Sequence, residues 1–197
     1  MKTKAILFDV DGVVLFPRDK YFSQRLKEDG YDIDGEKVGQ FFKDKYKQIV
    51  VGEADLKEEL SKVITDWGWQ GTVDELLHYW FSYENKLNQE IIDFTQKLRL
   101  NGVKCYLASD HSEYRKQDLL NNIGLSQYFD GAFFSSDIGN TKEESEYYKK
   151  VLEQISLAPG EILFVDDDIK NIEVAKTVLP NTLVFTTLEN LKENIYA

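Results

Sequence analysis

Residues 5–12 read Ala5-Ile6-Leu7-Phe8-Asp9-Val10-Asp11-Gly12, a short apolar run that ends in two carboxylates and a glycine. An apolar run of this length, closed by a glycine, predicts a buried strand. In open α/β sheets the ligand lies beyond the carboxyl ends of the strands, which is where Asp9 and Asp11 would emerge. A solvated turn that closes the strand explains this tetrapeptide equally well, so the rest of the chain has to decide.

The second half of the chain repeats this pattern. Apolar runs enriched in β-branched or aromatic residues predict strands at 4–8, 103–108, 131–134, 162–165 and 182–186. Helical spacing of apolar residues predicts helices at 90–100, 112–123, 143–154 and 171–178. Because strands alternate with helices, we expect an α/β fold with a Rossmann-like, doubly wound parallel sheet. Right-handed crossovers would align the carboxyl ends of its strands along one edge.

Residues 17–87 interrupt this alternation with long charged and aromatic segments that have helical spacing. The turn signals in this stretch are Asp29-Gly30, Asp34-Gly35, Gly52 and Gly68. They favour two helical hairpins, so we predict a helical domain, residues 17–87, inserted into a core formed by residues 1–16 and 88–197. The aromatic residues of the insertion include Trp67, Trp69, Trp80 and Tyr83. We expect them to form the core of the inserted domain, with a binding surface as the alternative.

The charge of the chain disfavours one class of partner. Its 197 residues include 24 Lys and Arg against 35 Asp and Glu, which gives a formal net charge of −11. This sign is wrong for a general nucleic-acid footprint, so we expect no nucleic-acid partner. A small anionic substrate is compatible with it, provided that a metal ion and a lysine reverse the potential inside one pocket.

The number of cysteines and the lengths of the apolar runs indicate where in the cell the protein is located. Cys105 is the only cysteine, which excludes an intramolecular disulfide and favours a small buried thiol. The first apolar run ends at Asp9, too early for the core of a signal peptide. No segment approaches the ~18 apolar residues of a membrane span. We therefore expect a cytoplasmic protein with no membrane partner, and the sequence does not fix the oligomeric state.

Polar residues follow the later strands as well as the first. Ser109-Asp110-His111 come after the second predicted strand, Lys142 follows the third, and Asp166-Asp167-Asp168 come after the fourth, with Asn171 just beyond. One shared edge of the sheet explains all of these groups at once.

The chain resembles the haloacid dehalogenase-like (HAD) superfamily in the order of four motifs, which here are Asp9-Val10-Asp11-Gly12, Ser109, Lys142 and Asp166-Asp167. The resemblance spans essentially the whole chain. Segments 136–142 and 164–171 look like the branch with a helical cap inserted after the first strand, which identifies residues 17–87 as the cap. Within that branch they are most similar to small sugar-phosphate phosphatases and to the phosphatase-like domain of epoxide hydrolases.

The resemblance implies catalytic and substrate-binding roles. Asp9 would be the nucleophile that forms an aspartyl-phosphate, and Asp11 would be the acid and base that serves the leaving alkoxide and the hydrolytic water. Ser109 would donate to a phosphoryl oxygen, and Lys142 would supply fixed positive charge near Asp9 and the phosphate. Asp110 lies beside them in the substrate-binding region.

The resemblance also implies Mg²⁺, whose preference for hard oxygen ligands suits this cluster. The implied ligands are the Asp9 carboxylate, the Asp11 backbone carbonyl and Asp167, with Asp166 as an alternative ligand or a supporting residue. Asn171, one helical turn beyond Asp167, would orient that carboxylate or a metal-bound water. Asp168 is expected to cap the helix that follows.

Two positions depart from the family pattern. Asp110 stands where this branch usually has Asn, so a carboxylate lies near the expected site of a dianionic phosphate and should weaken its binding unless it points away or pairs with a cation. His111 would supply that cation if protonated, but we expect an exposed loop histidine. Glu143 stands where a proline commonly follows the motif lysine, and it would compete for the Lys142 ammonium.

The leading hypothesis from these residues is a Mg²⁺-dependent phosphatase acting on a small phosphomonoester, with a sugar phosphate as one candidate substrate. Dehalogenation fits less well because it needs neither Asp11 nor a metal. A phosphonate hydrolase, with Lys43 or Lys57 forming a Schiff base, and a phosphomutase are the enzymatic alternatives. A non-catalytic or regulatory binding module on the same fold is the alternative from another class.

Overall fold

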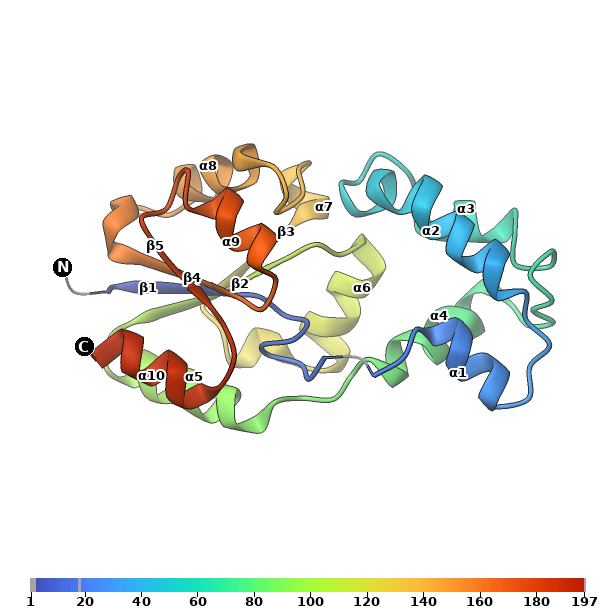
Figure 1. The fold of residues 1–197 in the computed structure, drawn as a ribbon, viewed down its shortest axis with the longest axis horizontal. Coiled ribbons are helices and arrows are strands. Elements are labelled where there is room, and N and C mark those ends of the chain that lie inside the picture. The colour runs from blue at the N-terminus through green and yellow to red at the C-terminus, as the bar shows by residue number, and fades with distance from the viewer. Residues whose placement is uncertain (1–2, 18, 197) are drawn as a thin grey trace.

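A five-stranded parallel sheet organises the chain in the computed structural model, which describes residues 3–17 and 19–196 (Figure 1). Its strands are β1 (Ala5–Phe8), β2 (Lys104–Ser109), β3 (Gly131–Phe134), β4 (Ile162–Asp166) and β5 (Asn181–Val184). The strand order is β3-β2-β1-β4-β5. The predicted fold class is confirmed, and each strand begins or ends within two residues of its predicted bounds. Residues 1, 2, 18 and 197, which belong to the predicted domain segments, lie outside the described residues.

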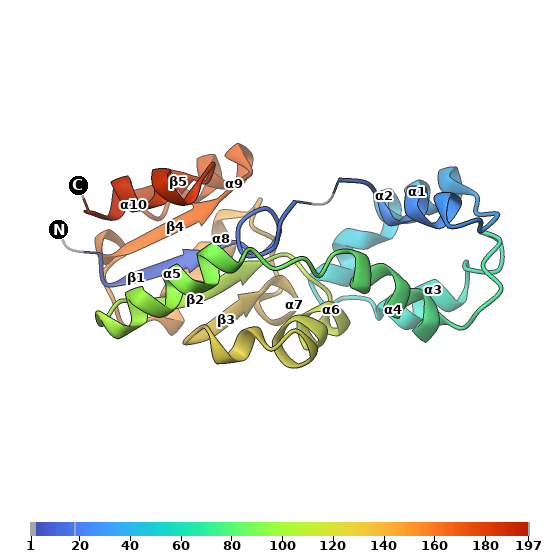
Figure 2. The same ribbon diagram turned by 90° about the horizontal axis from the view of Figure 1, so that it is seen from below.

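Helices cover both faces of the sheet, so that all four residues of β1 are buried. One face carries α5 (Gln89–Leu100) and α10 (Leu188–Tyr196), together with α6 (Glu113–Gln117) and its continuation as a π-helical turn, Asp118–Asn122. The other face carries α8 (Ser145–Gln154) and α9 (Ile169–Ala175). Figure 1 shows α8 above the strands and α5 below them, and Figure 2 views the molecule from the α5 side. Short elements complete the core: α7 (Ser135–Ile138) and two 3-10 turns, Leu125–Gln127 and Pro159–Glu161.

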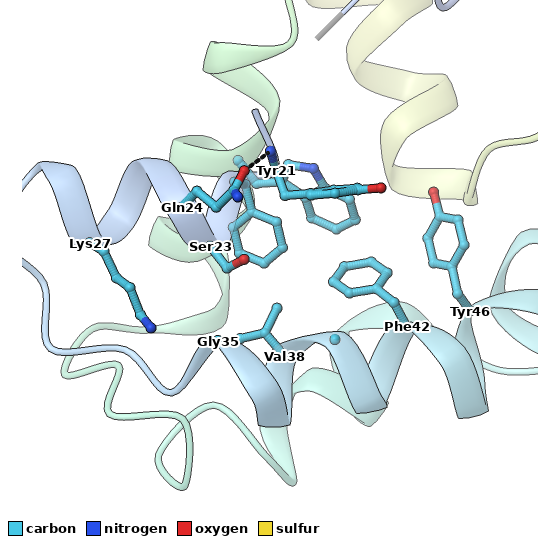
Figure 3. A pocket seen from close by; sticks show the side chains of 11 residues that line it. Tyr21, Ser23, Gln24, Lys27, Gly35, Val38, Phe42 and Tyr46 are labelled. Carbon is cyan, nitrogen blue, oxygen red and sulfur yellow. Dashed lines mark hydrogen bonds between the residues drawn. The ribbon is translucent and has the colours of Figure 1, made fainter. Parts of the chain in front are cut away.

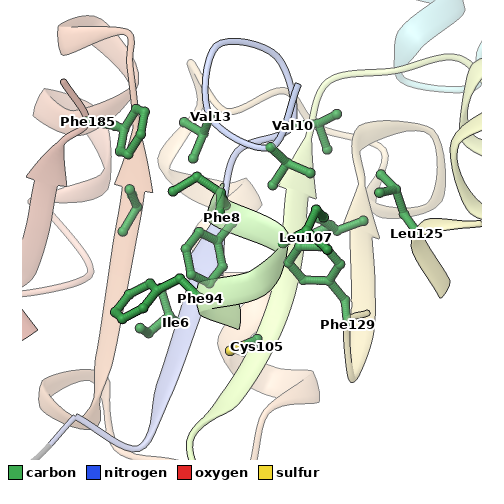
Figure 4. Close-up of a cluster of buried hydrophobic side chains, with 14 of the residues drawn as sticks. Ile6, Phe8, Val10, Val13, Phe94, Cys105, Leu107, Leu125, Phe129 and Phe185 are labelled. Atoms are coloured by element: carbon green, nitrogen blue, oxygen red, sulfur yellow. The ribbon is translucent and has the colours of Figure 1, made fainter. Parts of the chain in front are cut away.

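Alternate side chains of β1 pack into two separate apolar clusters, as expected for a strand buried on both sides. Ile6 and Phe8 lie in the first, with Phe94 of α5 and the predicted buried thiol Cys105 (Figure 4). Leu7 lies in the second, against α8 and α9. Burial raises the pKa of Cys105 to about 12, so this thiol is a packing residue. Asp9 continues the strand and is therefore fixed by packing on both faces.

Four helices lie between β1 and α5 as a separate layer beyond the carboxyl edge of the sheet: α1 (Phe22–Glu28), α2 (Gly35–Val50), α3 (Leu56–Ser61) and α4 (Val73–Tyr83) (Figure 1). We call them the helical insertion. Asp34, Asp55 and Thr72 cap the starts of α2, α3 and α4 with side-chain hydrogen bonds. The insertion has its own core, which contains Trp67, Trp69 and Trp80, whereas Tyr83 stays 43% exposed. Gly35, predicted as a turn residue, instead begins α2.

Two antiparallel connections join the insertion to the sheet. The Phe16 amide donates to the Lys86 carbonyl over 2.9 Å, and the Asn88 amide donates to the Val14 carbonyl over 2.9 Å. Arg115 of α6 is buried and donates to the Asp118 carboxylate over 2.8 Å and to the Glu84 carbonyl over 3.1 Å. These contacts fix the end of α4 against the core. No helix among the described residues is long and apolar enough to cross a membrane.

Candidate active site

Three neighbouring strands deliver the predicted polar residues to one edge. Asp9 directly follows β1, Ser109 is the last residue of β2, and Asp166 is the last residue of β4. The Asp9 amide donates to the Val165 carbonyl over 2.9 Å, which extends the pairing of β1 with β4 to this residue. Since β1 lies between β2 and β4, the chain changes direction across the sheet here, and such switch points are where α/β sheets bind ligands.

Lys142 bridges the first and last motifs. Its Nζ lies 2.6 Å from Oδ1 of Asp9 and 2.8 Å from Oδ2 of Asp166. All three residues are buried, with relative exposures of 4%, 5% and 0%. In the sequence, only the order of the motifs indicated that Lys142 is a site residue. The structure places it in direct contact with both carboxylates. Glu143, by contrast, is exposed and does not compete for the ammonium.

The backbone of Lys142 is held from two sides, which fixes where its ammonium can reach. Asp110 accepts the Lys142 amide on both carboxylate oxygens, each at 3.1 Å. The Tyr148 hydroxyl, from α8, donates to the Lys142 carbonyl over 3.0 Å. Asp110 is therefore directed toward the peptide backbone of the third motif. The role of Tyr148 was missed by sequence reasoning, because nothing in its spacing separates it from the other buried residues of α8.

The two carboxylates after β4 have different surroundings. Asp166 accepts hydrogen bonds from the Asp168 amide at 2.8 Å and from Asn171 at 3.1 and 3.2 Å, in addition to Lys142. Asn171 thus contacts Asp166, which corrects the expectation that it would orient the Asp167 carboxylate; the alternative, that it orients a metal-bound water, stays a prediction. Asp168 caps α9 by accepting the Lys170 amide over 2.9 Å, as predicted.

Asp167 instead lies against the first motif. Gly12 has a φ of +83°, and a Cβ at this position would come within 2.1 Å of Oδ2 of Asp167. The glycine thus serves both the left-handed turn after Asp11 and the close approach of this carboxylate. Asp167 is also the more exposed of the pair, whereas Asp166 is buried.

The site has more negative than positive charge. Burial would lower the pKa of Lys142, but Asp9 and Asp166 outweigh it, so the pKa is raised and the ammonium stays charged. Burial, reinforced by Asp166 against the effect of Lys142, raises the pKa of Asp9 well above its usual range. Burial and then Asp166 also raise the pKa of Asp167. One ammonium therefore does not balance these carboxylates.

The same carboxylates fit a divalent cation. Oxygen atoms of Asp9, Asp166 and Asp167 all lie within 4.8 Å of one another. An all-oxygen set of this kind suits a hard cation such as Mg²⁺. Because Asp166 already accepts from Lys142, Asn171 and the Asp168 amide, Asp9 and Asp167 have the freer oxygens to offer.

Asp11 lies on a loop that folds back over the end of β1, where the Leu15 amide donates to the Val10 carbonyl over 2.8 Å. Its carboxylate is 40% exposed, and Oδ2 lies 3.7 Å from Nε2 of His111. His111 is only 5% exposed, so the prediction of an exposed loop histidine was wrong. The imidazole packs near Phe134, with ring centroids 6.2 Å apart.

Comparisons with known proteins establish the family of the chain and agree with its fold. The model of the haloacid dehalogenase-like hydrolases matches residues 3–178. The chain belongs to this family. A phosphorylated carbohydrates phosphatase of Thermotoga maritima is 23% identical over 88% of this chain and 81% of its own. A D-ribitol-5-phosphate phosphatase of Bacteroides thetaiotaomicron is 27% identical over 88% of this chain and 87% of its own.

A HAD family enzyme from the same Bacteroides species, solved with magnesium and inorganic phosphate, superposes with a TM-score of 0.80 at 22% identity, covering 96% of this chain and 98% of its own. At that identity the likeness establishes the shared fold.

Proposed function

We propose that this protein is a Mg²⁺-dependent phosphatase that hydrolyses a small phosphomonoester through an aspartyl-phosphate on Asp9. The observation that carries the proposal is the Lys142 ammonium, which lies between Asp9 and Asp166 inside a cluster of three carboxylates. Phosphoryl transfer requires a positioned nucleophile and positive charge around the phosphoryl oxygens. Asp9 would supply the first, and Lys142 together with a cation held by the carboxylate cluster would supply the second. The phosphatase names of the two relatives favour the same chemistry.

In the first half-reaction an oxygen of Asp9 attacks phosphorus, and the bond from phosphorus to the ester oxygen breaks. Val10 donates its amide to Oδ1 of Asp9 over 2.7 Å, and Lys142 binds the same oxygen, so the carboxylate is oriented before substrate arrives. Ser109, buried at the end of β2, would donate to a phosphoryl oxygen. Asp11 gives its proton to the departing alkoxide.

In the second half-reaction water attacks the aspartyl-phosphate, and Asp11 takes the proton from that water. Asp9 is regenerated as inorganic phosphate leaves. The exposed position of Asp11, on the loop over β1, lets its carboxylate reach both the leaving oxygen and the water. His111 faces this carboxylate from the core side.

Mg²⁺ would be held by the carboxylates of Asp9 and Asp167 and by the Asp11 backbone carbonyl, with Asp166 in support. When bound, it would offset the charge of the carboxylates and of the phosphoryl oxygens. Residues 17–87 would act as the cap that closes over the substrate and excludes water. The contact of Ser135 with Val50, where the hydroxyl donates to the carbonyl over 2.6 Å, brings the end of α2 close to this edge.

The alternatives have less support. Asp11 and the acidic cluster have no task in a dehalogenase. Schiff-base formation needs a lysine that can lose its proton in a buried site, whereas Lys43 is exposed and Lys57 pairs with Asp74 over 2.6 Å near the surface. A non-catalytic module would not require Lys142 between two buried carboxylates.

The test is hydrolysis of a broad panel of phosphomonoesters by the purified protein, with Mg²⁺ and with a chelator. We expect release of inorganic phosphate from at least one ester, lost with the chelator and regained with Mg²⁺. Failure to hydrolyse any ester in the panel would contradict the proposal, and so would release that is unaffected by the chelator.

A further inference from the structure

A large groove lies in the helical insertion, between α1 and α2 (Figure 3). Its volume is about 590 Å³, within the range of about 300–1,000 Å³ usual for small-molecule sites. Its walls include Phe22, Val38, Phe42, Tyr46 and Trp80. We call it the aromatic groove.

The aromatic walls are rigidly assembled. The rings of Phe22 and Trp80 stack with centroids 5.1 Å apart, and Phe22 meets Phe42 edge to face at 5.7 Å. Trp80 is itself buried, with a relative exposure of 5%. Aromatic surfaces fixed in this way lose little conformational entropy when they bind a ligand.

Gly39 keeps the groove open. It lies inside the sixteen-residue helix α2, where glycine is less stable than alanine by roughly 0.5–1 kcal/mol. Its φ is not positive, and a Cβ built on it would meet no atom within 4 Å. Neither the backbone conformation nor a close neighbour therefore requires glycine at this position. What the missing side chain provides is space in the groove.

One end of the groove is directed toward the predicted phosphate site. The Val50 carbonyl accepts from Ser135, and Ser135 follows the strand whose Phe134 is paired in register with Ser109. Tyr46 lies one turn before Val50, about 6 Å along the helix axis. Lys47, beside it, pairs with Glu144 over 3.1 Å, two residues after Lys142. The Tyr46 end of the groove is therefore the end nearer to the core, and the Lys27 end lies farther out in the insertion.

The lining of the groove is mainly apolar, and its polar atoms belong to a few side chains: Tyr21, Ser23, Gln24, Lys27, Tyr46 and Trp80. Lys27 is the only charged side chain among the lining residues that the structure describes, and Figure 3 shows it at the end opposite Tyr46. The side-chain oxygen of Gln24 is already used, because it accepts the Tyr21 amide over 3.0 Å. A sugar would have to exchange each hydroxyl–water contact for a fixed partner, and every unpaired hydroxyl would cost about 1–3 kcal/mol. An apolar group carries no such penalty.

We propose that the aromatic groove binds the leaving group of the substrate and that this leaving group is an extended apolar one, aryl or alkyl, rather than a sugar. This inference rests on the proposed phosphatase function. Phosphate at the strand edge and an apolar body along α2 would place the scissile ester bond at the Tyr46 end of the groove.

The test compares decyl phosphate and 2-naphthyl phosphate with glycerol 3-phosphate and ribose 5-phosphate. In the natural protein with Mg²⁺, the two apolar esters are expected to have at least tenfold higher kcat/KM than the two polyol esters. Gly39→Leu fills the groove and should lower kcat/KM for decyl phosphate relative to glycerol 3-phosphate by at least tenfold, mainly through KM. Leucine also favours the helix, so the thermal midpoint should not fall.

Gln40→Leu is the matched control. It adds the same side chain to the next residue of α2, which is exposed and does not line the groove. This variant should keep the substrate preference of the natural protein. A preference for the polyol esters, or an unchanged preference in Gly39→Leu, would overturn the inference while leaving the phosphatase proposal standing.

Calorimetric binding of decylphosphonate, which has no ester bond to hydrolyse, separates the two proposals. Binding that is lost in Gly39→Leu and kept in Gln40→Leu supports the groove inference, whether or not any ester is hydrolysed. If such binding is found but no ester is hydrolysed, only the phosphatase proposal is overturned. Equal binding by all three proteins would overturn the groove inference.

Discussion

Replacing Asp110 by Asn is expected to stabilise the protein at neutral pH and not at acidic pH. Burial raises the pKa of Asp110 from 3.8 to about 6, although Lys142 and its amide oppose the shift. At about 1.4 kcal/mol per pKa unit, this difference is worth about 3 kcal/mol.

The direction in which stability changes with pH depends on whether the folded or the unfolded state binds the Asp110 proton more tightly. The folded state keeps the proton of Asp110 to a higher pH than the unfolded chain does, so stability is complete below about pH 4 and declines as pH rises to about 6. Asn has no proton to lose and retains one acceptor for the Lys142 amide. The variant should therefore gain about 3 kcal/mol over the natural protein between pH 4 and pH 7, or about 6–12 °C in thermal midpoint for a chain of this size.

The assay is thermal unfolding of both proteins from pH 4 to pH 8. Asp130→Asn is a control of opposite sign: despite its burial, the Cys105 amide, Lys104 and Arg99 lower the pKa of Asp130. That carboxylate stabilises the fold at neutral pH, so its loss should destabilise the protein there and matter less in acid. The reasoning is refuted if the difference in thermal midpoint between Asp110→Asn and the natural protein does not change with pH. It is also refuted if that difference changes with pH in the direction seen for Asp130→Asn.

Turnover of the same variant tests the direction of the Asp110 side chain. Asn removes a negative charge near the phosphate and keeps an acceptor for the Lys142 amide, so kcat/KM should be retained or raised. A large loss would show that Asp110 contacts the substrate itself.

Two further substitutions probe the charge cluster. Gly12→Ala puts a Cβ within 2.1 Å of the Asp167 carboxylate. The variant should therefore raise the Mg²⁺ concentration needed for half-maximal turnover at least tenfold. An unchanged Mg²⁺ requirement would contradict the assignment of Asp167 as a metal ligand. Lys142→Met leaves Asp9 and Asp166 facing each other without their cation, and should lower the free energy of unfolding by about 3–5 kcal/mol, with partial recovery in Mg²⁺. Chemical denaturation with and without Mg²⁺ measures this, and a variant as stable as the natural protein without metal would contradict the assigned charges.

The sheet was predictable chiefly because its central strands β1 and β4 are buried on both faces and therefore form uninterrupted apolar runs. The strand at 131–134 has the predicted bounds, and the others differ by at most two residues. The helical insertion was recognisable from its period, but Gly35 was misplaced because Asp34 caps the start of α2 instead of closing a turn. Helix α10 was missing from the predicted elements.

Side-chain contacts between distant motifs were not predictable to the same degree. The order of the motifs indicated that Lys142 belongs near Asp9. Helical spacing directed Asn171 to Asp167 or to a metal-bound water, whereas its amide binds Asp166. His111 is buried near Phe134 of β3 and Asp11, tertiary contacts that the local sequence does not encode. The aromatic groove likewise depends on the packing of α1 against α2, and a helical glycine such as Gly39 gives no sequence signal of an open space.

The central claim is that Asp9 carries the phosphoryl group during turnover. Rapid acid quench of the protein with Mg²⁺ and a hydrolysed ester, followed by mass spectrometry of the peptides, measures this directly. The account predicts a transient phosphoryl group on Asp9 in the natural protein, and no phosphoryl group and no turnover in a folded Asp9→Asn variant. A phosphoryl group on another residue, or turnover by Asp9→Asn at the rate of the natural protein, would contradict it.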